Sequence, residues 1–160
     1  MSIMEKRKKS VLFICADQWR WDCFGFMKHN NAITPYLDKL ANKSTFFKSH
    51  YSGIVPCGPS RTTMLTGLYP FIHRSIRNGA PLDKRFTNIA KEIKKNGYDP
   101  KLFGYTDTTW DPRFLDDKDN KKFTYESPME GFDPICHLPE GNPVLWANFL
   151  KSKGYDVKNA

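Results

Sequence analysis

The sequence predicts an α/β fold in which helices cover a mostly parallel sheet. The first observation is a length of 160 residues with 39% hydrophobic residues, which suits one globular domain or part of one. The second is a continuous apolar run, residues 10–16, typical of a strand that is buried on both faces of a parallel sheet. The third is the alternation of helical and strand-like segments along the chain, which favours a layered architecture.

Residues 1–9 form a basic tail ahead of the first expected strand, residues 10–16. Asp17 directly follows this strand, and open α/β sheets bind their ligands at the carboxyl ends of their strands. The apolar run is too short for a signal peptide and far shorter than the ~20 residues that cross a bilayer. We therefore expect a cytoplasmic protein without a membrane span.

Capping and turn residues mark the ends of the next elements, because proline is favoured at helix starts and glycine after helix ends. The expected order is a helix over 35–41, a strand or buried connector around 46–51, a helix over 60–67, a helix over 87–96 and a strand over 101–105. Residues 110–141 are rich in turn signals and predict a long loop. Residues 144–153 form the last expected helix.

The cysteines and the charge restrict the class of protein. Four cysteines, Cys15, Cys23, Cys57 and Cys136, lie at wide and irregular spacing, which is typical of free thiols in a reducing compartment. The formal net charge of +8 arises from 25 Lys and Arg against 17 Asp and Glu. These basic residues are spread along the chain without a nucleic-acid-binding motif, so we expect a solvated basic surface and no specific nucleic-acid partner.

The most informative segment is residues 55–67, V-P-C-G-P-S-R-T-T-M-L-T-G. Cys57 lies just before the expected amino terminus of a helix, where unsatisfied N–H groups and the helix dipole favour oxidised or anionic forms of its side chain. Arg61 lies one helical turn further on and can reach the same point. The segment is therefore either an activated-cysteine or anion-binding site, or a turn with a buried free cysteine.

Cys57-Gly-Pro-Ser-Arg61, followed by Leu65-Thr-Gly67, resembles the signature of type I sulfatases, in which Cys-x-Pro-Ser-Arg directs oxidation of the cysteine to formylglycine. Residues 17–22, 34–41 and 97–104 match the family in the same order. Residues 66–83 look most like the phosphonate monoester hydrolase branch of the alkaline phosphatase superfamily. The resemblance implies an incomplete alkaline-phosphatase-like sheet with helices on both faces, and makes residues 10–160 the N-terminal part of a sulfatase-like catalytic domain.

The resemblance implies a hydrolase of small anionic sulfate, phosphonate or phosphate esters. Formylglycine at Cys57 would be hydrated to a diol, one hydroxyl of which attacks the ester while the other later expels the inorganic product. Asp17, Gln18 and the oxidised Cys57 would bind a divalent metal, Ca²⁺, Mn²⁺ or Mg²⁺. A formylglycine-generating maturase is an implied partner, and an oligomer is compatible with the sequence.

Three further residues receive roles from the same resemblance. Arg61 would orient the diol, Asn78 would hydrogen-bond the substrate oxygens, and Tyr105 stands at the position of a catalytic lysine in many sulfatases. Judged without the resemblance, Tyr105 is an amphipathic packing residue at a strand end. Asp107 replaces the histidine that follows in the family pattern.

The family's catalytic domains are considerably longer, and later sequence completes their metal site. We therefore expect the 160 residues to be almost inert on their own. The alternative is a truncated, catalytically inactive fragment that acts as a basic binding or non-functional module. The choice between sulfate and phosphonate or phosphodiester substrates also stays open, because both present an anionic tetrahedral group.

Overall fold

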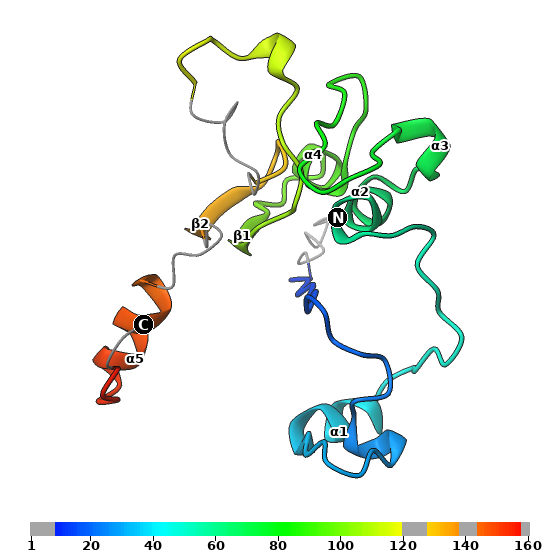
Figure 1. Cartoon of the computed structure of the whole chain (residues 1–160), viewed down its shortest axis with the longest axis vertical. Helices are drawn as coiled ribbons and strands as arrows, with labels where there is room; N and C mark the ends of the chain where they lie inside the picture. The colour runs from blue at the N-terminus through cyan, green and yellow to red at the C-terminus, as the bar shows by residue number, and fades with distance from the viewer. Residues whose placement is uncertain (1–8, 120–127, 138–143, 158–160) are drawn as a thin grey trace, which may run out of the picture. The chain divides into compact units, whose positions relative to one another are not determined.

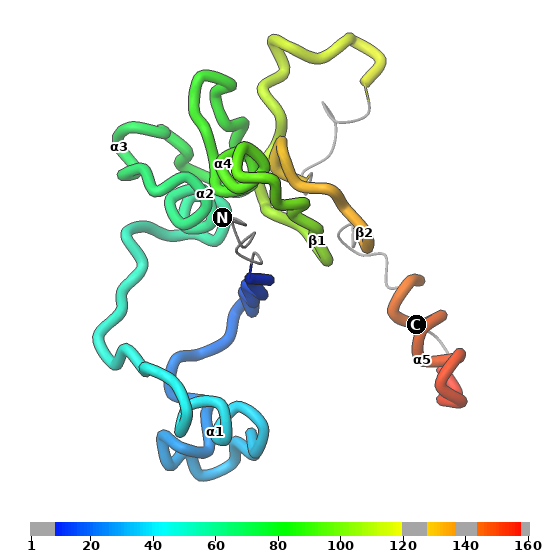
Figure 2. Tube along the Cα trace, turned by 180° about the vertical axis from the view of Figure 1, so that it is seen from behind, coloured from blue at the N-terminus to red at the C-terminus, as the bar shows by residue number. Residues whose placement is uncertain are grey.

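The computed structural model describes residues 9–119, 128–137 and 144–157. It contains two compact units, Met1–His50 and Tyr51–Ala160. Each unit is described by itself below, and Figures 1 and 2 show the course of the chain through both.

The first unit is organised around Asp38. It contains the 3-10 helix η1 (Gly25–Met27) and the expected helix, α1 (Pro35–Ala41), which begins with proline as predicted. The Asp38 carboxylate accepts hydrogen bonds from the Phe26 N–H (3.0 Å) and the Thr34 hydroxyl (2.8 Å). The Thr34 oxygen in turn accepts the Gly25 N–H at 2.9 Å, so polar contacts attach η1 to the start of α1.

The strand predicted over residues 10–16 is absent. These residues adopt an irregular conformation, and Val11 and Leu12 are 81% and 84% exposed. A strand needs a neighbour that pairs with its backbone N–H and C=O groups. The described residues of the first unit include no second strand, so the apolar run has nothing to pair with there. Residues 46–51 form neither a strand nor a buried connector, because they are irregular and exposed, with Phe47 71% and Tyr51 83% exposed.

The second unit contains the remaining elements. They are α2 (Cys57–Thr66), α3 (Pro70–His73), α4 (Ile89–Lys95), β1 (Lys101–Gly104), the 3-10 helix η2 (Pro112–Phe114), β2 (Asp133–His137) and α5 (Val144–Ser152). The helices α2, α4 and α5 and the strand β1 confirm the predicted element types, and their boundaries lie within three residues of the predicted ones. No helix in the described parts of the chain has the length and apolarity needed to cross a membrane.

The sheet consists of β1 and β2, which lie side by side in both views (Figures 1 and 2). They pair in parallel from Lys101 opposite Asp133 to Gly104 opposite His137, with a shift in register after Leu102. The mixed helix and strand content and the parallel sheet confirm the predicted α/β class. β2 lies inside residues 110–141, where the sequence predicts a loop. The prediction is wrong at β2, because the Asp-Pro pair of this strand resembles a turn signal. An edge strand tolerates proline.

A small core holds the second unit together. Leu65 of α2, Leu82 and Met129 are buried in contact with one another, and Phe86 and Phe132 pack against them. The Trp110 indole N–H donates to the Pro128 carbonyl at 2.9 Å, which attaches the segment before β2 to the segment after β1. The core thus joins α2 to the loops that follow it.

Candidate active site at the start of α2

Helix α2 begins at Cys57 itself, three residues earlier than predicted. Pro56 is its N-cap residue, and Gly67 ends it with a left-handed conformation (φ 70°), as expected for a C-terminal glycine. Pro59 lies within the first turn, where proline is tolerated because the N–H groups there have no partner in the helix. Cys57 is therefore the first residue of a helix, with Arg61 one turn beyond it.

Asn78 contacts Cys57 directly. Its side-chain Nδ2 donates to the Cys57 Sγ at 3.2 Å, and its Oδ1 accepts the Gly58 N–H at 2.8 Å. A backbone N–H can only donate, so it identifies the oxygen of the Asn78 amide and leaves the NH₂ group facing the sulfur. The first turn of α2 and the loop around Asn78 thus form one hydrogen-bonded unit.

Arg61 and Tyr105 form a second pair at the same helix. The Arg61 side chain is buried, and its guanidinium lies over the Tyr105 ring, 4.4 Å from the ring centre. It also donates to the Tyr105 carbonyl at 3.2 Å and to the Tyr105 hydroxyl at 3.5 Å. Tyr105 directly follows β1, so the strand end positions the ring against α2. A guanidinium stacked on a tyrosine and bonded to a carbonyl is held in a fixed orientation.

The structure therefore brings Asn78 to Cys57 and Tyr105 to Arg61, with both pairs built on the first two turns of α2. Asp107 lies in the neighbouring loop, where it is 2% exposed and adopts a left-handed conformation (φ 59°). Its carbonyl accepts the Gly79 N–H at 3.4 Å, which links this loop to the Asn78 segment. The sequence analysis names all five of these residues, and the functional roles of Cys57, Arg61, Asn78 and Tyr105 remain predictions.

His73 is a buried histidine that joins α2 to α3. Its Nε2 lies 2.9 Å from the Thr63 hydroxyl, and its Nδ1 accepts the Ser75 N–H at 3.0 Å. The Thr63 hydroxyl already donates to the Pro59 carbonyl at 3.0 Å, so the histidine proton lies on Nε2. Burial lowers the pKa of His73 and favours the neutral ring. His73 therefore has a structural role in fixing the helix that carries Cys57.

Asp17 and Gln18, the predicted metal ligands, belong to the unit Met1–His50, whereas Cys57 belongs to Tyr51–Ala160. A metal site that joins them remains a prediction. Carboxylate and amide oxygens are hard donors of the type that Ca²⁺, Mn²⁺ and Mg²⁺ prefer, so the chemistry of the donors fits. Within residues 9–119, 128–137 and 144–157, no three His, Cys, Asp or Glu side chains gather into a group that could hold a metal ion.

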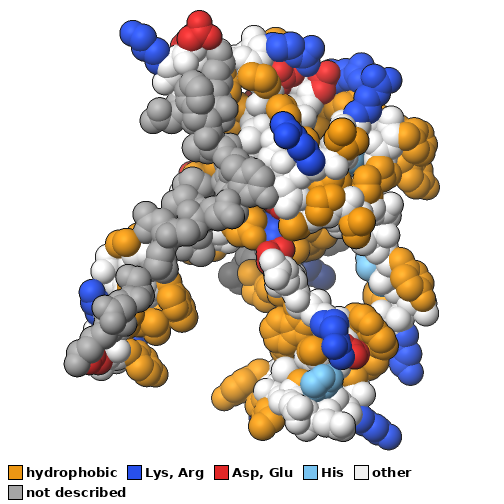
Figure 3. All heavy atoms as spheres, in the orientation of Figure 1, with side chains coloured by type: hydrophobic (Ala, Val, Ile, Leu, Met, Phe, Trp, Pro, Cys, Tyr) orange, Lys and Arg blue, Asp and Glu red, His pale blue; other side chains and the backbone are white. Residues whose placement is uncertain are grey.

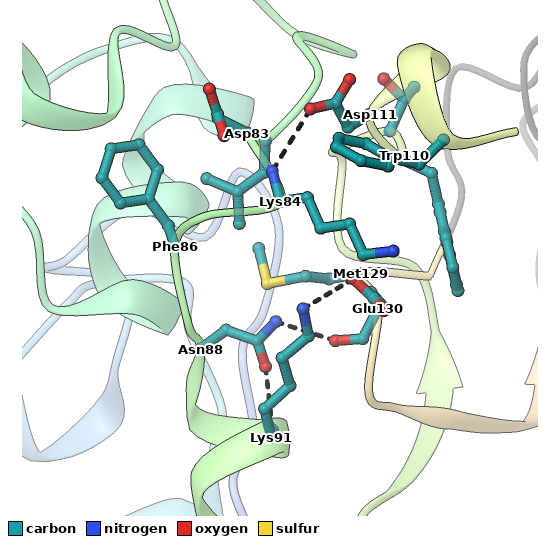
Figure 4. A pocket seen from close by; sticks show the side chains of 12 residues that line it. Asp83, Lys84, Phe86, Asn88, Lys91, Trp110, Asp111, Met129 and Glu130 are labelled. Atoms are coloured by element: carbon teal, nitrogen blue, oxygen red, sulfur yellow. Dashed lines mark hydrogen bonds and ion pairs between the residues drawn. The ribbon is translucent and has the colours of Figure 1, made fainter.

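A separate hollow of about 40 Å³ lies between residues 82–88, 109–114 and 129–130 (Figure 4). Lys91 and Glu130 form an ion pair at its lining (2.6 Å), and the Asn88 side chain donates to the Glu130 carbonyl at 2.8 Å. Its volume corresponds to about one or two water molecules. None of Cys57, Arg61, Asn78 and Tyr105 lines the hollow, so we assign it no catalytic function.

Comparisons with known proteins connect this geometry to a family. The family model described as sulfatase matches residues 9–151. The "multifunctional alkaline phosphatase superfamily protein PehA" of Trinickia caryophylli is 41% identical over 155 residues, which are 94% of this chain and 30% of that relative.

Two solved structures are also similar. The phosphonate monoester hydrolase of Agrobacterium radiobacter is 46% identical with a TM-score of 0.79, and the match covers 87% of this chain and 27% of that chain. The phosphonate monoester hydrolase of Silicibacter pomeroyi is 44% identical with a TM-score of 0.82, over 95% of this chain and 30% of that chain. The fold is therefore alkaline-phosphatase-like, as the sequence predicted, and this chain spans between 27% and 30% of the length of these three relatives.

Proposed function

Because the chain belongs to the sulfatase family, we propose that it is part of a hydrolase of sulfate, phosphonate or phosphate esters whose nucleophile is a formylglycine formed from Cys57. The observation that carries the proposal is the placement of Cys57 as the first residue of α2, with the Asn78 NH₂ group 3.2 Å from its sulfur. A helix start and an amide donor together provide hydrogen bonds to an anionic group at this point.

In the proposed reaction, the hydrated aldehyde at position 57 provides two hydroxyl groups. One attacks the sulfur or phosphorus of the ester, the bond to the alcohol oxygen breaks, and the alcohol leaves with a proton. The second hydroxyl then loses its proton, the aldehyde carbonyl reforms, and the inorganic product departs. Water regenerates the diol.

The residues around position 57 have distinct roles in this proposal. Asn78 donates its NH₂ hydrogens to the substrate oxygens, because the Gly58 N–H fixes its orientation. Arg61, held by Tyr105, orients the diol and balances its charge, and Tyr105 would assist the leaving ester, as the lysine at this position does in many sulfatases. Asp17 and Gln18 would hold the divalent metal, which would lower the pKa of the diol and polarise the ester.

We further propose a formylglycine-generating maturase as a partner and a cytoplasmic location. The four cysteines are all free, and a reducing compartment keeps them so. A small anionic ester is the expected substrate, and the net charge of +8 favours its approach. Among the possible esters, the likeness to two phosphonate monoester hydrolases favours phosphonates.

The first test is the oxidation state of Cys57 in a host with a formylglycine-generating enzyme. Mass spectrometry of the tryptic peptide is expected to show the aldehyde at Cys57 and thiols at Cys15, Cys23 and Cys136. Arg61→Ala should prevent the oxidation, whereas the control Arg20→Ala should leave it intact. Four unmodified cysteines in such a host would contradict the proposal and favour the alternative, an inactive basic module.

The second test is turnover of 4-nitrophenyl sulfate and a phenylphosphonate monoester with added Mn²⁺ or Ca²⁺. The 160 residues alone should be almost inert, because Asp17, Gln18 and oxidised Cys57 supply fewer than the roughly six to eight oxygens that Ca²⁺ takes. A version extended with family sequence should gain activity that Cys57→Ala abolishes. Robust turnover by the 160 residues would show that the proposed site is wrong.

A further inference from the structure

Gly58 occupies a point of very close approach beside Cys57. A Cβ atom at this position would lie 2.8 Å from the Asn78 Cα and 2.9 Å from the Asp107 carbonyl oxygen. Both neighbours are backbone atoms, which cannot rotate aside as a flexible side chain can. The first turn of α2, the Asn78 loop and the Asp107 loop therefore meet where a side chain has no room.

In a helix interior alanine is a better helix former than glycine, and Gly58 has no left-handed conformation that would require glycine. Pro59 nevertheless restricts the residue before it, because the proline ring clashes with a preceding Cβ atom in a helical backbone. Glycine at position 58 avoids this local clash. The approach of the Asn78 and Asp107 loops is a second restriction, which arises only in the folded chain.

The close approach has a direct effect on the Asn78 amide. It lets the Gly58 N–H reach the Asn78 Oδ1 at 2.8 Å, and this bond leaves Nδ2 facing the Cys57 sulfur at 3.2 Å. The N–H groups of a first helical turn have no partner within the helix, so this one is available for the side chain. One glycine thus sets both the distance and the orientation of the amide.

We infer that Gly58 is a positioning residue for the Asn78 amide, which it holds by its N–H and by its lack of a side chain. The inference rests on the proposed function in one respect, because the proposed function assigns Asn78 the role of binding the substrate oxygens. A wider residue at position 58 would turn or displace the NH₂ group and leave the nucleophile in place without its donor.

The test uses hydrogen exchange and side-chain amide signals in ¹⁵N-labelled chain. In the unchanged chain, the backbone amide of Gly58 should be protected, and the Asn78 NH₂ signals should shift on Cys57→Ala. Gly58→Ala should speed exchange at position 58 by at least tenfold and move the Asn78 signals. The matched control is Gly53→Ala, because a Cβ at Gly53 meets only the Thr63 methyl group at an ordinary 3.9 Å.

A folded Gly58→Ala variant with unchanged Asn78 signals would overturn the inference, and so would equal effects of Gly53→Ala. If Gly58→Ala does not fold, substitutions of Asn78 decide. Asn78→Ala should remove the protection of the Gly58 amide, and Asn78→Asp, which keeps an acceptor oxygen, should restore it. Protection that survives Asn78→Ala would refute the inference. All these signals are read on the unoxidised chain, so a failure to form formylglycine would refute only the proposed function.

Discussion

Asp111 shows what one carboxylate contributes to the second unit. It accepts hydrogen bonds from the backbone N–H of Lys84 (3.3 Å) and of Arg113 (3.1 Å), and it binds the Arg113 guanidinium. These contacts, with the Arg113 side chain foremost, lower the pKa of Asp111 to about 2. Asp111 is only 7% exposed, whereas the Arg113 side chain that it binds is 64% exposed. Its loss therefore removes the acceptor of two backbone N–H groups and one partner of a charged pair.

We predict that Asp111→Ala lowers the free energy of unfolding by about 2 kcal/mol at neutral pH, which is the usual contribution of hydrogen bonds to a charged group. Because the folded pKa is depressed, the stabilisation is present above the ordinary pKa and is lost as the pH falls through about 2. Urea unfolding of both proteins between pH 2 and 7 measures this. The control Asp99→Ala removes an exposed ion pair with Lys101 and should cost less than about 1 kcal/mol; equal losses would contradict the prediction.

The sequence identified Cys57, Arg61, Asn78 and Tyr105 but did not single out Gly58. Motif order and spacing can be read directly from the sequence, and they identify Cys57, Arg61, Asn78 and Tyr105. The need for glycine at position 58 arises from loops around Asn78 and Asp107 that approach α2 only in the folded state. A helical glycine before Pro59 was the available signal, and it has the simpler explanation of a helix start.

Helices α2 and α3 are joined through His73, and their stability should therefore depend on pH. A proton on Nδ1 would remove the acceptor of the Ser75 N–H, and burial already disfavours the charged ring. Between its lowered folded pKa and its ordinary value, His73 binds more protons in the unfolded chain. The free energy of unfolding should consequently fall as the pH drops from the ordinary value through the folded one.

Denaturant midpoints from pH 8 to pH 5 measure this effect. His73→Gln should lower stability at pH 8 and reduce the slope below pH 7, because the titrating ring is gone. His50, an exposed histidine, provides the control, and His50→Gln should leave the slope unchanged. An unaltered slope in His73→Gln would show that the dependence has another origin.

Helix α4 depends on Asn88 at its amino terminus. The Asn88 Oδ1 accepts the Lys91 N–H at 3.1 Å, as a helix cap does, and the Nδ2 donates to the Glu130 carbonyl at 2.8 Å. Asn88 is 2% exposed, so both bonds are shielded from water. One side chain therefore caps the start of α4 and attaches it to the segment before β2.

We predict that Asn88→Ala costs about 2–3 kcal/mol, since it removes a cap worth about 1 kcal/mol and leaves a buried carbonyl without its donor. The control Asn96→Ala changes an exposed residue at the other end of α4, whose amide donates to the Glu92 carbonyl, and should cost under about 1 kcal/mol. Thermal unfolding followed by circular dichroism compares the two. A smaller loss for Asn88 than for Asn96 would be incompatible with this assignment.

Element prediction succeeded where local chemistry decides and failed where distant pairing decides. Pro35 and Gly67 fix helix ends through their own backbones and Asn88 does so through its side chain, and the ends of α1, α2 and α4 lie close to where the sequence indicates. Whether residues 10–16 and 110–141 form strands depends instead on whether another strand lies beside them in the folded chain. The first found no partner in its unit, and part of the second paired with β1 as β2.

At the scale of the whole chain, apolar side chains remain at the surface in unusual number. Figure 3 shows hydrophobic side chains spread over the visible face, among lysines and arginines. The exposed fractions are 84% for Leu12, 72% for Phe103 on β1, 55% for Ile135 on β2 and 57% for Trp146 on α5. Each element thus presents apolar area to water, at an unfavourable free energy of roughly 25 cal/mol per Å².

The last prediction is that the 160 residues associate with themselves at micromolar concentration. β1 and β2 pair only with each other among the described residues, so each has an outer edge that another strand can join. Size-exclusion chromatography with light scattering should show a mass that rises with concentration, and more so in salt that screens the charge of +8. Phe103→Lys should weaken association by adding charge to β1, whereas the control Tyr36→Lys, on an exposed residue of α1, should change it less. A monomer at every concentration, with no binding of a hydrophobic dye, would mean that these apolar faces are covered in solution.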